Sequence, residues 1–123
     1  MGNAQAKHTV EQFIDAINNK NVDGVLNLVT DDIRFENTGP APDGERYQGK
    51  ESMKTFWEQF FANAPNARFE LENILTAEDH VVVRHQYYWA ENGQGPDPGR
   101  VRGVTILDIR DGKIAGMYPY VKG

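Results

Sequence analysis

The stretch VLNLVTDDIRFEN, residues 25–37, changes its pattern half-way along, and this change decides the fold. Its first part continues an apolar stripe at helical spacing up to Val29, and Asn21 is placed to cap this short helix. After the acidic pair the period becomes two, so Phe35 and Asn37 share one side of a strand. We therefore expect a helix that leads into a strand, with an amide at the inward-facing end of that strand.

Two further helices are predicted on either side of this stretch. Thr9 followed by Gln12 is a capping-box pattern, which predicts that the first helix begins at Thr9 and ends near Asn18. An aromatic-rich segment predicts another helix from Lys50 that ends before Pro65. The sequence therefore places three helices in its first half.

The second half of the chain has the pattern of consecutive strands. Phe69, Leu71 and Asn73 alternate with polar residues, and the dipeptide at 111–112, Asp-Gly, is typical of a tight hairpin turn. Further strands are expected over 81–90, 101–110 and 114–121, and loops rich in Gly and Pro over 38–49 and 91–100. This order predicts one α+β domain over 1–123, with helices packed on one face of a curved, mostly antiparallel sheet.

Composition excludes several functional classes. A net charge of -5 without a basic cluster argues against a nucleic-acid partner or an anionic membrane. The absence of cysteine excludes disulfides and thiolate metal sites. His80 and His85 would point to opposite faces of one strand, so we expect no metal and no cofactor. No apolar run near the N-terminus suits a signal peptide, and we expect a cytoplasmic protein.

The order and spacing of two segments carry a family resemblance. NNKNVDGVLNLVTDDIRFEN early in the chain and VRGVTILDIRDGKIAGMYPY late in it, with Gly49 before the third helix, resemble the SnoaL-like branch of the nuclear transport factor 2-like superfamily. This resemblance implies a cone-shaped domain, often dimeric, with a cavity between the helices and the concave sheet. The superfamily includes ketosteroid isomerases, polyketide cyclases, epoxide hydrolases and non-enzymes, so the fold implies a pocket and not a reaction.

The resemblance also tests particular reactions. Ketosteroid isomerases have an aspartate base where this chain has Asn37, and oxyanion donors where it has Phe13 and Thr105. An amide cannot accept a proton as the aspartate base does. We therefore reject isomerisation by the catalytic residues of the ketosteroid isomerases. Asp108 and Arg110 are a fragment of the epoxide-hydrolase set, but strand parity places them on the outer face if Thr105 faces inward.

His85 is the candidate catalytic residue. On strand 81–90 the odd-numbered face is the more apolar, which places His85 on the concave side as a potential base or acid. The alternative is a hydrogen-bonded core histidine, which the lack of an evident carboxylate nearby favours. Asn37 and Thr105 are potential polar contacts in the pocket. The alternative for Asn37 is hydrogen bonding within a turn, and the alternative for Thr105 is that it is only a residue that favours strands.

Two functions stay open. One is an enzyme of the isomerase, cyclase or dehydratase type that moves a proton on an apolar, oxygenated small molecule, and the other is a non-enzymatic binding or interaction domain. In either case the cavity wall should coincide with much of the core. The expected lining is Phe13, Ile17, Phe35, Asn37, Trp57, Phe61, Phe69, Leu71, His85, Tyr87, Trp89, Thr105, Leu107 and Met117.

The last strands predict an assembly. Tyr118 and Tyr120 alternate with Met117, so if Met117 faces the cavity the tyrosines face outward with Val104 and Ile106. An outer sheet face of this composition needs a cover, and we expect a homodimer.

Overall fold

A computed structural model describes residues 3–88 and 99–122 of the chain. It contains three helices and a six-stranded sheet. The elements are α1 (Asn3–Asn18), α2 (Val22–Asn27), β1 (Val29–Glu36), β2 (Arg46–Gln48), α3 (Lys50–Asn63), β3 (Arg68–Ala77), β4 (His80–Tyr88), β5 (Arg100–Arg110) and β6 (Lys113–Val121). The predicted α+β class is confirmed. Within the described ranges, no helix combines the length and apolar character needed to cross a membrane.

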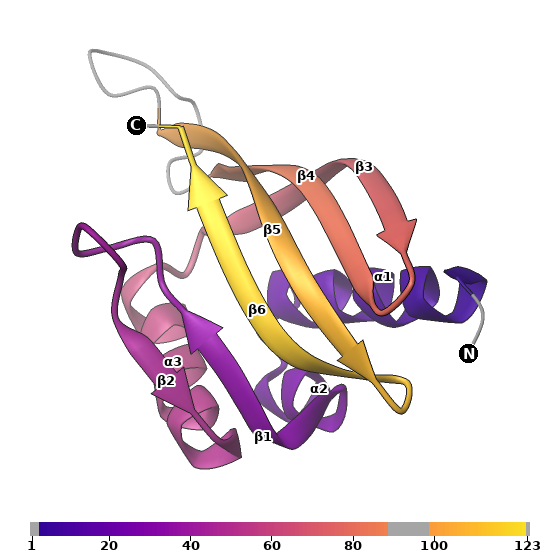
Figure 1. Cartoon of the computed structure of the whole chain (residues 1–123). Coiled ribbons are helices and arrows are strands. Elements are labelled where there is room, and N and C mark those ends of the chain that lie inside the picture. The colour runs from indigo at the N-terminus through magenta and orange to yellow at the C-terminus, as the bar shows by residue number, and fades with distance from the viewer. Residues whose placement is uncertain (1–2, 89–98, 123) are drawn as a thin grey trace.

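The strand order across the sheet is β2-β1-β6-β5-β4-β3 (Figure 1). Strands β3 to β6 pair antiparallel in sequence order, as predicted, and the 111–112 turn joins the last two with positive φ angles at both residues. Strand β1 pairs in parallel with β6 and sets Phe35 beside Met117. The early strand and the last strand therefore meet at one side of the cavity.

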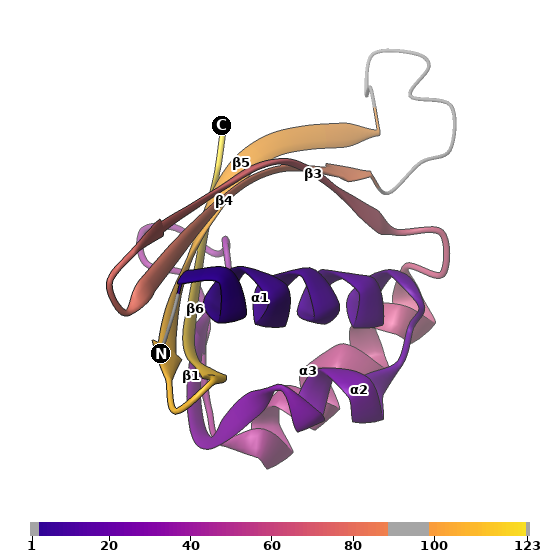
Figure 2. The ribbon, with the colours of Figure 1, turned by 90° about the vertical axis from the view of Figure 1, so that its right-hand side faces the viewer.

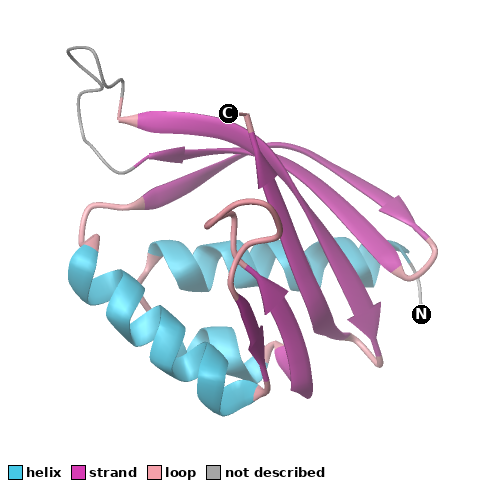
Figure 3. Ribbon diagram, turned by 60° about the vertical axis from the view of Figure 1, so that its left-hand side comes forward, coloured by secondary structure: helices cyan, strands magenta, loops and turns pink. Residues whose placement is uncertain are grey.

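The sheet curls over α1, and α2 and α3 lie below, so all three helices occupy its concave side (Figures 2 and 3). Helix α1 packs mainly on β3, and α3 packs on β1. The core fills the space between helices and sheet, with fully buried side chains from both layers: Val10, Phe13, Ile17, Val25, Val29, Ile33, Met53, Trp57, Val81, Val83, Leu107 and Ile114. Burial of this apolar surface is the main favourable term that holds the two layers together.

The predicted start of α1 was wrong. The helix begins at Asn3, and Thr9 lies inside it, buried, with its hydroxyl donating to the carbonyl of Gly112 at 3.3 Å. The buried face extends back to Ala6, a strong helix former. A contact with the distant hairpin therefore replaces the expected capping box.

Helix α2 begins as predicted but ends earlier. The side chain of Asn21 accepts a hydrogen bond from the backbone N–H of Gly24 at 3.0 Å, which confirms the cap. Val29 is not the last residue of the helical stripe. It is the first residue of β1, where it pairs with Ile114 of β6. Strand pairing there overrides the helical pattern of the local sequence.

Two strand predictions were also wrong. The segment 38–49 is not all loop, because β2 pairs with β1 and stacks Tyr47 on Phe35 with ring centroids 5.6 Å apart. In β3 a bulge lies between Leu71 and Asn73, so Asn73 pairs with outward-facing Arg84 and does not share the face of Phe69 and Leu71 as the alternation predicts. One extra residue in a strand exchanges its two faces beyond that point.

Candidate functional site

A cavity of about 180 Å³ lies between α3 and the concave face of the sheet. Its described lining residues are Phe35, Asn37, Thr38, Phe56, Trp57, Phe60, Phe69, His85, Tyr87, Val101, Thr105, Met117, Pro119 and Val121. None of these described residues carries a carboxylate, an ammonium or a guanidinium group. A second cavity of about 10 Å³ lies toward α1 and shares Phe69, His85, Thr105 and Met117 with the first. The wall is thus apolar and aromatic with a few uncharged polar groups, as ligand sites commonly are.

Neighbouring strands bring His85 and Thr105 together. His85 of β4 is paired in register with Gly103 of β5, so Thr105 is its diagonal neighbour on the same face. Gly103 is required where β5 meets β6, because a Cβ there would lie 2.3 Å from the carbonyl oxygen of Tyr120. The register of three strands therefore fixes the position of the pair.

The imidazole of His85 is only 3% exposed, and its Nε2 lies 2.8 Å from Oγ1 of Thr105. Its Nδ1 is buried and has no hydrogen-bond partner among the residues that the structure describes. Phe69 packs against the ring edge-on, with centroids 5.8 Å apart. Burial lowers the pKa of His85, and the weaker opposing effect is the charge of Glu72. The ring is therefore neutral at neutral pH, in the state that accepts a proton.

Trp57 contributes a second unsatisfied polar group to the same wall. Its side chain is 2% exposed, and its Nε1–H has no hydrogen-bond partner in the described part of the chain. Phe56 and Phe60 meet its ring edge-on, at centroid distances of 5.0 and 5.4 Å, and hold it in place. Buried polar atoms without partners are rare and cost free energy.

Asn37 lies at the end of β1, where the cavity wall meets a closed loop. Its backbone N–H donates to the carbonyl of Glu45, and its Oδ1 accepts from the backbone N–H of Thr38, both at 2.8 Å. Asn37 is also one of the residues that line the cavity. Asn37 therefore combines both sequence interpretations, turn bonding and a position in the wall.

The structure separates the residues predicted to line a pocket into groups. Those at the main cavity are Phe35, Asn37, Trp57, Phe69, His85, Tyr87, Thr105 and Met117, and those at the deeper one also include Phe13, Ile17 and Leu107. Phe61 and Leu71 are not among the described lining residues of either cavity. Phe61 packs on Trp57 beside the ammonium group of Lys20, and Leu71 pairs with His85 in the sheet. Trp89 lies outside the described residues.

Sequence reasoning missed several lining residues for which a signal existed. Phe56 and Phe60 belong to the apolar face of α3, one turn apart. Val101, Pro119 and Val121 share strand parity with Thr105 and Met117, and this parity predicts that they face inward. Thr38 follows the end of β1 and had no periodic signal.

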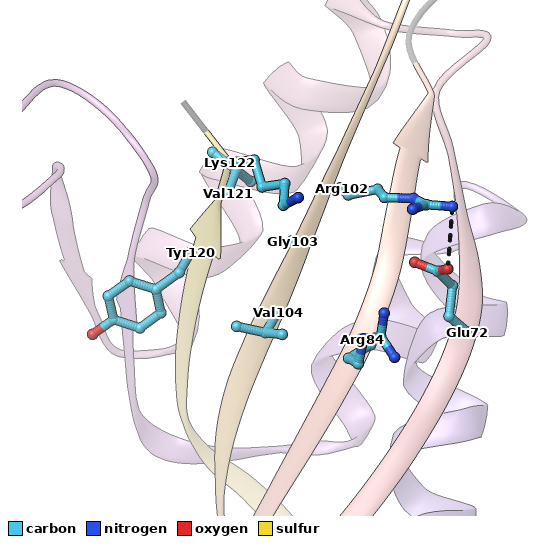
Figure 4. A pocket seen from close by; sticks show the side chains of 8 residues that line it. All are labelled: Glu72, Arg84, Arg102, Gly103, Val104, Tyr120, Val121 and Lys122. Carbon is cyan, nitrogen blue, oxygen red and sulfur yellow. Dashed lines mark ion pairs between the residues drawn. The ribbon is translucent and has the colours of Figure 1, made fainter.

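A larger groove of about 300 Å³ lies on the outer face of the sheet (Figure 4). Its charged lining residues are Arg84, Arg102, Lys122 and Glu72, and Arg102 pairs with Glu72 at 3.7 Å. The buried unpartnered groups of the described chain, in contrast, are on the concave side. We therefore place the candidate site in the inner cavity.

The outer face also holds the other residues considered for chemistry. His80 pairs with Asp108 at 2.8 Å on the surface, and Arg110 forms an ion pair with Asp32. This confirms that the Asp108–Arg110 fragment faces away from the cavity and that His80 points away from His85. No cluster of three or more metal-ligating side chains occurs within residues 3–88 and 99–122.

The model of the SnoaL-like domain family matches residues 10–117 of the chain. The chain belongs to the SnoaL-like family. Among solved structures, this SnoaL-like chain is similar to an NTF2-like protein of unknown function from Mesorhizobium loti, at 31% identity and TM-score 0.81 over 98% of this chain and 93% of the other. No protein of curated function matches it.

Two more distant structures support the fold alone. A protein described as a putative ketosteroid isomerase from Kribbella flavida shares 16% identity at TM-score 0.79, over 98% of this chain and 79% of the other. A putative SnoaL-like polyketide cyclase from Jannaschia shares 23% identity at TM-score 0.78, over 97% and 86% of the two chains. The SnoaL-like chain therefore has the cone-shaped NTF2-like fold that the sequence predicted.

Proposed function

We propose that this SnoaL-like protein binds a small, apolar, oxygen-bearing molecule in the inner cavity and that His85 exchanges a proton with it. The observation that carries the proposal is the state of His85: a buried, neutral imidazole in an apolar wall, with one ring nitrogen bonded to Thr105 and the other without a partner. A neutral imidazole accepts protons at neutral pH, and an adjacent hydroxyl can hold its ring and tautomer in place.

Family membership supports this proposal at a coarse level. Structures of this fold are described as a putative ketosteroid isomerase and a putative polyketide cyclase. The isomerase residues themselves are replaced here, since Phe13 has no polar atom and Thr105 bonds to His85. Any proton transfer in this chain would therefore rely on His85 and not on an aspartate base.

The alternative is binding without chemistry. It is favoured by one observation: the hydrogen-bonding partner of His85 is a threonine hydroxyl and not a carboxylate, so nothing bonded to the ring stabilises an imidazolium. Both functions use the same cavity, and they differ in whether a bound molecule exchanges protons.

Hydrogen exchange into a bound ketone tests this difference. Cyclohexanone is incubated with the protein in D₂O, and deuterium at the carbons beside the carbonyl is followed by NMR. We expect exchange above the buffer rate, and loss of that excess in the His85→Gln variant with retained binding. Binding with exchange at the buffer rate would leave the non-enzymatic function as the correct one.

We also propose that a second copy of the chain covers the outer sheet face. An apolar row crosses four strands there, because Leu75 pairs with Val82, Val82 with Ile106, and Ile106 with Tyr118. Tyr120 extends it beside Val104, and it is 57% exposed, as Leu75 is at 54%. A continuous apolar row on the face without helices is typical of an interface. Light scattering at micromolar concentration tests the expected dimer mass.

A further inference from the structure

We propose that the inner cavity selects uncharged molecules the size of a single six-membered ring that carry a hydrogen-bond acceptor. This proposal rests on the binding function proposed above and specifies the ligand class. Three features of the wall support it: its volume, its lack of charge and the donor of Trp57.

The volume sets the size of the ligand. The cavity holds about 180 Å³, and an apolar protein cavity of about 150 Å³ accommodates benzene. A steroid or another fused polycyclic skeleton takes up much more space than a single ring such as benzene. The walls are rings already in contact: Phe69 stacks on Tyr87 at 4.8 Å, and Phe60 meets Tyr87 at 5.9 Å. Enlarging the cavity would separate these pairs, so we expect one ring to fit and fused rings to be excluded.

The lining sets the charge of the ligand. The described wall residues include no ionised side chain to pair with a carboxylate or an ammonium group. A charged group brought into such a wall loses its hydration without compensation. Burial lowers the pKa of His85, as expected for a wall that disfavours positive charge. A neutral ligand is therefore preferred over an acid or amine of the same shape.

Trp57 sets the required polar group. Its indole Nε1–H is a donor only, and it is buried in the wall without a partner in the described chain. A ligand with a carbonyl, ether or hydroxyl oxygen can accept this bond, and a hydrocarbon of the same shape cannot. One recovered hydrogen bond corresponds to about three- to tenfold in the dissociation constant.

The test measures the binding of four probes by calorimetry. Cyclohexanone is the neutral acceptor, cyclohexane lacks the acceptor, cyclohexanecarboxylate adds a charge, and androstenedione is a fused-ring ketone. We expect cyclohexanone to bind about three- to tenfold more tightly than cyclohexane and the other two to bind more weakly still. The Trp57→Phe variant keeps an aromatic ring and should reduce the ketone preference to near unity. Tyr120→Phe is the matched control, because it removes a polar atom from a ring on the outer face.

A second measurement does not depend on a variant that folds well. The indole N–H resonance of Trp57 in the unaltered protein should move downfield on addition of cyclohexanone and stay in place with cyclohexane. Equal binding of the two probes, or an unmoved indole resonance, would overturn the acceptor requirement. Tighter binding of androstenedione or the carboxylate would overturn the ligand class while the binding function stands. Binding of none of the four would overturn both proposals.

Discussion

Nε2 of His85 lies 2.8 Å from Oγ1 of Thr105, and this bond joins two neighbouring strands inside the wall of the cavity. The sequence left two alternatives for His85, a hydrogen-bonded core residue or a residue of the cavity wall, and the structure shows that both hold. His85 is a hydrogen-bonded core histidine, and its ring also lines both inner cavities. Thr105 is the partner that holds it. Variants of the pair should therefore change stability and binding together.

The change His85→Ala should lower the free energy of unfolding by roughly 1–3 kcal/mol, because it leaves the buried hydroxyl of Thr105 without its partner. It should also weaken cyclohexanone binding. Urea unfolding and calorimetry on the same variant provide the two measurements. His85→Gln is the control that keeps a hydrogen-bonding group. A destabilised His85→Ala protein that binds the ketone normally would contradict the functional role of His85.

Stability should fall as the pH drops below about 6.5, the ordinary pKa of histidine. Burial lowers the pKa of His85 in the folded state, so the unfolded chain binds a proton that the folded chain does not. The resulting slope is at most about 1.4 kcal/mol per pH unit. Urea titrations between about pH 7 and 5.5 measure it. The His85→Gln variant should have a smaller slope, and an equal slope would refute burial of a neutral ring.

The unaltered protein should show no ketosteroid isomerase activity, because the amide of Asn37 cannot accept a proton and the proposed inner cavity excludes fused rings. Asn37→Asp alone should not restore full activity, since Phe13 and Thr105 do not supply the usual oxyanion donors. Loss of one such donor costs about a hundredfold or more in rate. A spectrophotometric assay with androst-5-ene-3,17-dione tests both proteins. Robust turnover by the unaltered chain would overturn the comparison of these positions.

The change Ile106→Glu should split the proposed dimer, because Ile106 lies in the middle of the apolar row between Val82 and Tyr118. Light scattering should then report the mass of one chain, while circular dichroism remains that of the folded protein. Lys54→Glu is a matched control that changes charge on the exposed side of α3. An unaltered protein that is already monomeric at micromolar concentration would refute the interface.

The change Gly44→Ala should disturb the loop that holds Asn37 and Thr38. Gly44 has a φ of 82°, and an added Cβ would lie 1.7 Å from the carbonyl oxygen of Asn37. The left-handed conformation alone costs a non-glycine residue about 1–2 kcal/mol. Thermal unfolding should show the loss, and cyclohexanone binding should weaken. Gly39→Ala, in the same loop, is the control, because nothing lies within 4 Å of its added Cβ. Equal effects of the two changes would contradict this explanation.

The sequence by itself determined which face each residue occupies wherever the strand pattern is regular. Period two placed His85 on the concave face and set Tyr118 on the side of its strand opposite Met117, and the structure agrees. The Asn21 cap and the 111–112 turn were predictable for the same reason: their hydrogen bonds and dihedral angles depend on residues close in sequence.

Only the tertiary structure decided which distant segments meet. The parallel pairing of β1 with β6, the short strand β2, and the bulge that turns Asn73 outward all depend on partners far along the chain. The bond of His85 to Thr105 and the unpartnered Nε1 of Trp57 depend on the same packing. Local periodicity in the sequence indicates whether a side chain is buried. It does not indicate which group the side chain contacts. The contact partner depends on how layers from separate parts of the sequence pack around one core.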